Sequence, residues 1–128
     1  MHRIILWGLV TSLALLSQEV STASANFVVV LSRGPKWIAG KTVSEQPLRE
    51  HGLYLNRLME GGKLVLAGPF VDDSGGLILL RAANAAEAQK IADEDPAIQS
   101  QIMQSVVRPF RVAFDATTGL SPFKKKAP

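Results

Sequence analysis

The sequence predicts a small α+β fold in which a four-stranded sheet is covered on one face by two helices. Three observations predict it: short apolar runs of strand length, an amphipathic helical pattern after the first run, and an alanine-rich helical pattern after the third. A chain of 128 residues suits one domain. Cysteine is absent and 47% of the residues are hydrophobic, so apolar burial without disulfides must hold the core.

The N-terminal residues 1–25 have the layout of a secretory signal peptide. His2 and Arg3 form a positive start, Ile4 to Leu16 is apolar, and Ala23-Ser24-Ala25 is typical of a cleavage site. We expect cleavage between Ala25 and Asn26 and export to the periplasm or the extracellular space. The apolar run is shorter than the roughly 20 residues that cross a bilayer, so we expect no stable membrane insertion. An uncleaved anchor is the alternative.

The C-terminal residues 116–128 form a basic tail behind a folded domain of residues 26–115. Lys124, Lys125 and Lys126 supply a charge equal to the formal net charge of +3, so the rest of the chain is close to neutral. A basic run at a chain end is most often solvated. We therefore expect no nucleic-acid partner.

The first strand and the first helix are predicted from apolar spacing. Phe27 to Leu31 is apolar at every position, which is typical of a strand buried on both faces. After a long connection, Pro47 suits the first turn of a helix, and Gly61-Gly62 ends that helix. The residues that share the inward helical face by their spacing are Leu48, His51, Leu55, Leu58 and Met59.

The second half of the domain repeats strands and a helix. Asn84, with Glu87 three residues later, predicts the start of the second helix through a capping box, and Pro96 stops it after Asp95. Ala85, Ala88, Ile91 and Ala92 form its small inward face. The predicted strands are Lys63–Phe70, which ends at Gly68-Pro69, Leu77–Leu80, paired to it as a hairpin, and Val106–Phe114; residues 98–103 are expected to form a turn.

The resulting order of strand, helix, strand, strand, helix, strand is the split βαβ pattern of a ferredoxin-like sandwich. Two helices cover only one face of such a sheet. The runs FVVVL and LILL are nevertheless apolar at successive positions, so the second face also requires burial. A second copy of the same sheet meets that requirement, and we expect a homodimer.

His51 is the main candidate for chemistry, because it is the only histidine outside the predicted leader and lies on the inward helical face. One interpretation is a core histidine whose nitrogens bond backbone carbonyls or water. The other is a general acid/base, which needs a carboxylate to fix its tautomer. Asp95 is the best candidate partner. Asp93 and Glu94 compete with it, and all three also fit a solvated acidic helix end.

Other candidate binding residues are weaker. Gly68 and Pro69 let the backbone approach a small-molecule ligand, or simply end a strand. Trp37 and Tyr54 suit a cavity wall, or the core. Arg108 suits an anionic ligand, or pairs with an acid near the end of the second helix. With a single histidine and no cysteine in the domain we expect no metal site, and with no nucleotide-binding motif we expect no cofactor.

Several motifs together make the chain similar to a known family. They are His51, the G-x-L-x-x-A-G-P run of Gly62 to Pro69, Gly76-Leu77, the alanine-rich run Ala85 to Ala92, Asp95-Pro96 and Val107 to Phe110. From about Phe27 to Phe114 the chain resembles the YciI-like, YCII-related family. The resemblance implies a dimeric α+β barrel of ferredoxin-like subunits whose active site is a His–Asp pair, here His51 and Asp95.

The resemblance also implies a reaction class. Relatives on the same barrel are similar to muconolactone isomerases and to a dehydrochlorinase of hydroxylated aromatics, so a cofactor-free proton-transfer enzyme of lyase or isomerase type is expected. The alternative is a non-catalytic small-ligand-binding or stress-associated module. The chain departs from relatives at Leu48, at Ala97 and at Gln101, where some of them carry arginine, an aromatic residue and glycine.

Overall fold

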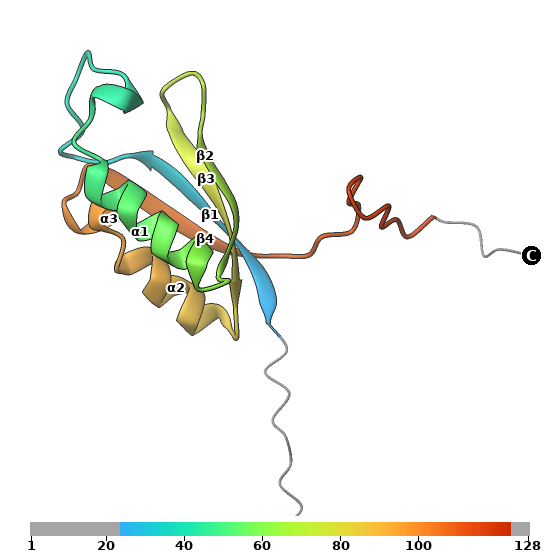
Figure 1. Cartoon of the computed structure of the whole chain (residues 1–128). Helices are drawn as coiled ribbons and strands as arrows, with labels where there is room; N and C mark the ends of the chain where they lie inside the picture. Colours follow the sequence, from blue (N-terminus) through green and yellow to red (C-terminus); the bar gives the residue numbers. More distant parts are fainter. Residues whose placement is uncertain (1–23, 124–128) are drawn as a thin grey trace, which may run out of the picture.

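The computed structural model describes residues 24–123 (Figure 1). Residues 1–23 of the predicted leader and the lysines at 124–126 lie outside the described residues. The elements in chain order are β1 (Ala25–Arg33), the short 3-10 helix η1 (Val43–Glu45), α1 (Arg49–Glu60), β2 (Leu64–Pro69), β3 (Gly75–Ala82), α2 (Ala85–Asp93), α3 (Pro96–Gln99) and β4 (Met103–Phe110).

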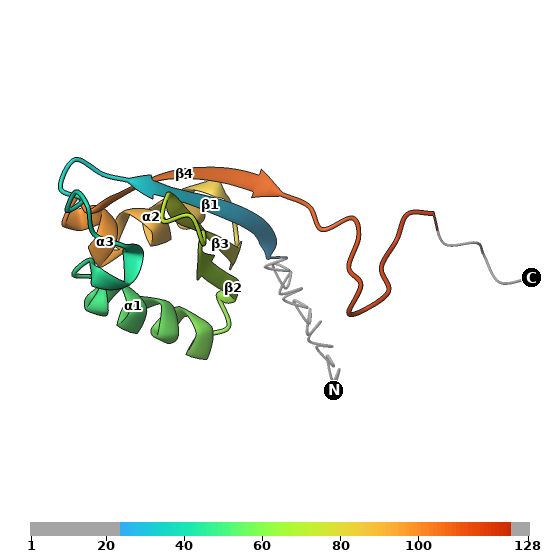
Figure 2. The ribbon, with the colours of Figure 1, turned by 90° about the horizontal axis from the view of Figure 1, so that it is seen from above.

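The four strands form one antiparallel sheet in the order β2-β3-β1-β4. The three α-helices lie together on one face of this sheet, as the view from above shows (Figure 2). The ferredoxin-like prediction is therefore confirmed. Within residues 24–123 no helix has the length and apolar character needed to cross a membrane.

The core lies between the sheet and the helices, and β1 supplies alternate residues to it. Phe27, Val29 and Leu31 are 4%, 1% and 3% exposed, whereas Val28 and Val30 face the helix-free side and are only half-buried. In one chain, therefore, the apolar run of β1 is fully buried on one face only. The reason is the two-residue period of a strand, which sends neighbouring side chains to opposite faces.

The inward faces of both long helices differ from prediction by one residue each. Met59 is exposed, and Tyr54 packs inward instead, because it lies at helical spacing between His51 and Leu58 on the same face. The Tyr54 hydroxyl donates to the Ile91 carbonyl of α2 at 2.7 Å and so ties the two helices together. On α2 the buried residues are Ala88, Ile91 and Ala92, while Ala85 is exposed.

The ends of several elements also differ from the prediction. The Asn84 side chain accepts from Glu87 N as predicted, but the Glu87 carboxylate accepts from Ala83 N, one residue before the expected partner. The predicted turn over residues 98–103 begins instead as the helix α3. The last strand starts at Met103 and ends at Phe110, so the expected strand residues 111–114 lie beyond the sheet.

Candidate active site

His51 and Asp95 lie side by side in the structure, although 44 residues separate them. His51 comes from the first turn of α1, and Asp95 stands between α2 and α3. The Nδ1 atom of His51 lies 2.8 Å from both carboxylate oxygens of Asp95. The contact expected between these residues is present, and its catalytic role stays a prediction.

The Asp95 carboxylate is held in place from two directions. It is 2% exposed, and its Oδ1 accepts from the backbone N–H of Ala97 at 2.9 Å as the N-cap of α3. Pro96 occupies the first position of that helix, where the missing N–H is harmless. A buried carboxylate needs such partners, and here a helix cap and an imidazole provide them. Asp93 and Glu94, the competing acids, are exposed.

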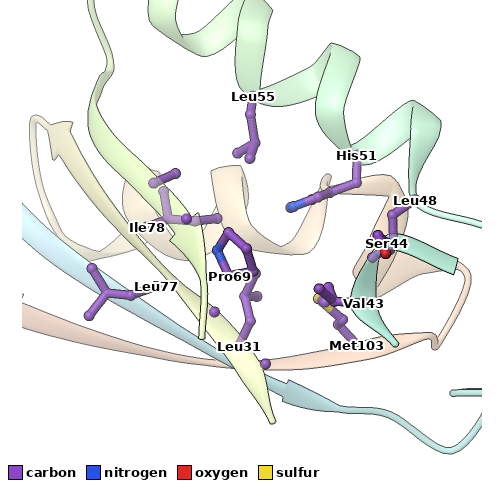
Figure 3. Close-up of a pocket in the computed structure, with 14 residues that line it drawn as sticks. Leu31, Val43, Ser44, Leu48, His51, Leu55, Pro69, Leu77, Ile78 and Met103 are labelled. Carbon is purple, nitrogen blue, oxygen red and sulfur yellow. The ribbon is translucent and has the colours of Figure 1, made fainter. Parts of the chain in front are cut away.

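The carboxylate also decides which nitrogen of the ring faces the cavity as an acceptor. An ionised carboxylate only accepts hydrogen bonds, so Nδ1 of His51 donates its proton to Asp95. In the neutral ring the other nitrogen, Nε2, then keeps a free lone pair. The imidazole points into a cavity (Figure 3). The geometry thus presents a proton acceptor to whatever occupies this space.

The cavity has a volume of about 390 Å³ and is enclosed by three parts of the chain. The segment before α1 forms one wall with Val43, Ser44 and Leu48. The helix α1 forms the second wall with His51 and Leu55. The sheet forms the third, and its labelled residues in Figure 3 include Leu31, Pro69, Ile78 and Met103.

The wall before α1 is fastened to the β2–β3 hairpin by Asp73, a residue that sequence reasoning missed. Its Oδ1 accepts from Val43 N at 2.9 Å, and its backbone carbonyl accepts from Arg33 Nε at 2.9 Å. Asp73 has φ of 60°, in the left-handed region that aspartate tolerates better than most residues. The dense turn residues around it were a signal for the turn, but not for this bond over 30 residues.

The segment before α1 is also held by hydrogen bonds among its own residues. Gln46 is 6% exposed, and its side-chain amide bonds both the N–H and the carbonyl of Ile38, each at 2.9 Å. Glu45 accepts from Thr42 N and from its hydroxyl, and these bonds lower the pKa of the Glu45 carboxyl. The long connection before α1 is therefore held by its own hydrogen bonds and forms part of the cavity wall.

Among the other predicted binding residues, Gly68 and Pro69 line the cavity, and Pro69 also ends β2. A close backbone approach is needed behind them, because a Cβ on Gly76 would lie 2.8 Å from the Gly68 carbonyl oxygen. Trp37 does not line this cavity. It is half-buried against the core, with the Arg33 guanidinium 5.2 Å from its ring centroid.

Arg108 also lies away from the cavity, on the opposite face of the sheet. It pairs with Val28 across the β1–β4 ladder, and directly opposed residues share a face. That face carries no helix, so Arg108 is exposed, and within residues 24–123 it forms no ion pair with Asp93 or Glu94. Its contact with an anionic ligand stays a prediction. The strand register that selects the face on which Arg108 lies is not visible in the sequence.

The Tyr54 hydroxyl is influenced by the acidic residues Glu94 and Asp95. Burial raises the pKa of its hydroxyl above the ordinary value, and the negative charges of Glu94 and Asp95 raise it further. Tyr54 therefore stays neutral and keeps its bond to the Ile91 carbonyl. Within residues 24–123, no group of three or more His, Cys, Asp or Glu side chains is arranged to hold a metal ion.

The chain is similar to known proteins in both sequence and structure. The model of the YCII-related domain matches residues 26–111. Among solved structures, 5-chloro-2-hydroxyhydroquinone dehydrochlorinase from Burkholderia phenoliruptrix AC1100, in complex with 2,5-dihydroxybenzoquinone, is similar with a TM-score of 0.51. The sequence identity is 18%, over 67% of this chain and 93% of that chain. A search of the curated proteins gives no match.

Proposed function

This chain belongs to the family of YCII-related domains, and from that premise we propose that it is a cofactor-free enzyme that moves a proton on a small organic substrate. The reaction type is that of a lyase or an isomerase. The observation that carries the proposal is the Asp95 carboxylate, buried 2.8 Å from His51 Nδ1, which aims the other side of the imidazole at a cavity.

In the proposed reaction Asp95 positions His51, and His51 is the catalytic residue. The free lone pair of Nε2 takes a proton from the substrate, and the Asp95 carboxylate stabilises the imidazolium that forms. In an isomerase the proton then returns to a different atom. In a lyase a leaving group departs with its bonding electrons. The likeness in fold to a dehydrochlorinase supports hydroxylated ring compounds as the first substrates to test.

The test follows proton transfer directly. The protein is incubated in deuterium oxide with hydroxylated aromatic and carbonyl compounds, starting with 5-chloro-2-hydroxyhydroquinone, and deuterium uptake and chloride release are measured. We expect conversion by the wild-type protein and a loss of about 10²–10⁴-fold in His51→Gln. Asp93→Asn is the matched control, because its exposed carboxylate bonds Gln89 and not the histidine.

The same experiment separates the alternative function. A wild-type protein that binds these compounds but neither exchanges protons nor releases chloride is a non-catalytic small-ligand-binding or stress-associated module. In that case His51→Gln changes affinity only modestly, because the apolar walls of the cavity remain. Catalysis is then excluded for the compounds tested.

We further propose that the protein is a homodimer joined through the helix-free face of the sheet, which completes an α+β barrel. Leu66, Val106 and Phe110 are 54%, 59% and 47% exposed, an apolar surface of the kind that marks an interface. Light scattering should show a dimer that Val106→Asp converts to a monomer. The control Leu53→Asp, on the exposed side of α1, should stay dimeric.

We also propose that the protein is exported and cleaved between Ala25 and Asn26. Cleavage there removes only Ala25 from β1 and leaves the residues that match the family, which begin at 26. Mass analysis of the protein from the periplasm or the medium should give an N-terminus at Asn26. Intact protein found only in the cytoplasm overturns the proposal.

A further inference from the structure

The cavity beside His51 carries few polar side chains. Among its lining residues only His51 and Ser44 have a polar side chain, and the others are aliphatic residues, methionine, proline and glycine. Ser44 is exposed at the edge, and its Oγ lies 3.0 Å from the Thr42 hydroxyl, so its bonding capacity is shared. No charged side chain of the described residues other than the imidazole lines the cavity.

This lining disfavours a charged ligand. An anion that enters loses its hydration, and no lysine or arginine side chain in the lining replaces the lost water. The Asp95 carboxylate, which is bonded to the far side of the imidazole, has the same sign as an anionic ligand. When His51 is protonated, its charge is already matched by Asp95. A carboxylate or phosphate therefore gains little from this site.

The lining also limits which proton His51 can take. Imidazole is a weak base, and the cavity side chains offer the substrate, besides the imidazole, only the Ser44 hydroxyl as a donor. In other enzymes a single donor aimed at a developing oxyanion contributes about 10²–10³-fold in rate. With so little help from side chains, the negative charge formed on the substrate must be spread over the substrate itself.

Resting on the proposed function, we infer that the substrate is an uncharged, largely apolar molecule with one ring, in which the carbon that loses the proton lies between two carbonyl groups that share the charge of the conjugate base. The cavity of about 390 Å³ is near the small end of the usual range of about 300–1,000 Å³, which suits one ring. The C–H bond between the carbonyls breaks, its proton goes to Nε2, and its electron pair becomes the enolate. Reprotonation at another atom completes an isomerisation.

Three probes of nearly equal size test this inference. Benzoylacetone is neutral with two carbonyls, benzoylacetate replaces its methyl group by a negative oxygen, and butyrophenone has a single carbonyl. Binding to the full chain is measured from NMR shifts. We expect benzoylacetone to bind at least about tenfold tighter than benzoylacetate, and Ser44→Lys to reduce or reverse that preference. Equal or tighter binding of benzoylacetate to the wild type, or no binding of benzoylacetone, overturns the inference.

Proton exchange tests the second half of the inference. His51-dependent deuterium uptake between the carbonyls of benzoylacetone, above the spontaneous rate, is expected, and none next to the carbonyl of butyrophenone. Uptake into butyrophenone overturns the requirement for delocalisation. The charge preference is also measured in His51→Gln, where no turnover occurs. If it persists there and the wild type exchanges nothing, the proposed function fails while the charge selection stands.

Discussion

Replacing Asp95 by asparagine keeps the shape of the side chain but changes what it offers to His51. Oδ1 accepts from Ala97 N at 2.9 Å, so the amide oxygen of an asparagine is drawn to the same place. The amide nitrogen then occupies the position of Oδ2; both positions lie 2.8 Å from His51 Nδ1, but the oxygen at Oδ1 already accepts from Ala97 N. A donor at that position favours an unprotonated Nδ1. The ring proton moves to Nε2, and the cavity loses its proton acceptor.

The expected magnitudes differ for activity and for stability. The same substitution in serine-protease triads lowers kcat by about 10⁴-fold because the tautomer is wrong, and we expect a loss of about 10³–10⁴-fold here. The helix cap to Ala97 survives, and a charge-assisted bond to His51 is exchanged for a neutral one. The free energy of unfolding should therefore fall by only about 1–2 kcal/mol.

The assay reads the tautomer without any substrate. In a His2→Gln background His51 is the only histidine, so long-range ¹H–¹⁵N NMR spectra report one ring. In the neutral ring the proton should be on Nδ1 in the parent protein and in the Asp93→Asn control, and on Nε2 in Asp95→Asn. A proton that stays on Nδ1 in Asp95→Asn, with turnover intact, refutes the reasoning that Asp95 sets the tautomer for catalysis.

Three further predictions concern the frame of the site. Asp73→Ala removes the acceptor for Val43 N and should weaken benzoylacetone binding several-fold in an NMR titration. Asp73→Asn accepts the same bond and tolerates φ of 60°, so it should bind normally. Equal losses in both variants contradict the role of this bond. Gln101 has φ of 63°, a conformation that glycine adopts without strain, so Gln101→Gly should raise the free energy of unfolding by about 0.5–1 kcal/mol, measured by urea denaturation. A loss of stability contradicts backbone strain at this position. Tyr54, the only tyrosine, has a raised pKa, so its contribution to stability is complete below the unfolded value of about 10 and disappears as the pH rises through the folded value. Tyrosinate absorbance should titrate above that value in the folded protein, and Tyr54→Phe should lose less stability at alkaline pH than the wild type does; identical pH profiles count against it.

The sequence was sufficient wherever the deciding interactions are local. The apolar runs and the helical spacing from Leu48 to Leu58 predicted the order of elements, because the periods of strand and helix are properties of the backbone. The helix stop at Asp95-Pro96 is also a local signal, and it makes Asp95 the best candidate partner of His51. The positions of Trp37 and Arg108 relative to the cavity could not be predicted, because they depend on strand register and on the path of a long connection. Neither the register nor the path of the connection can be predicted from a short sequence pattern.

The Asp95-Pro96 pair shows why a motif can be noticed and still be misread. It was interpreted as the stop of one helix, whereas Asp95 is also the N-cap of the next, and proline at the first helical position was the available signal. The cap does more than start a four-residue helix. Because Oδ1 is committed to Ala97 N, the carboxylate cannot rotate away from His51 without breaking that bond. Secondary structure therefore fixes the geometry of the His51–Asp95 pair. A variant that moves α3 should disturb His51 even when Asp95 is retained.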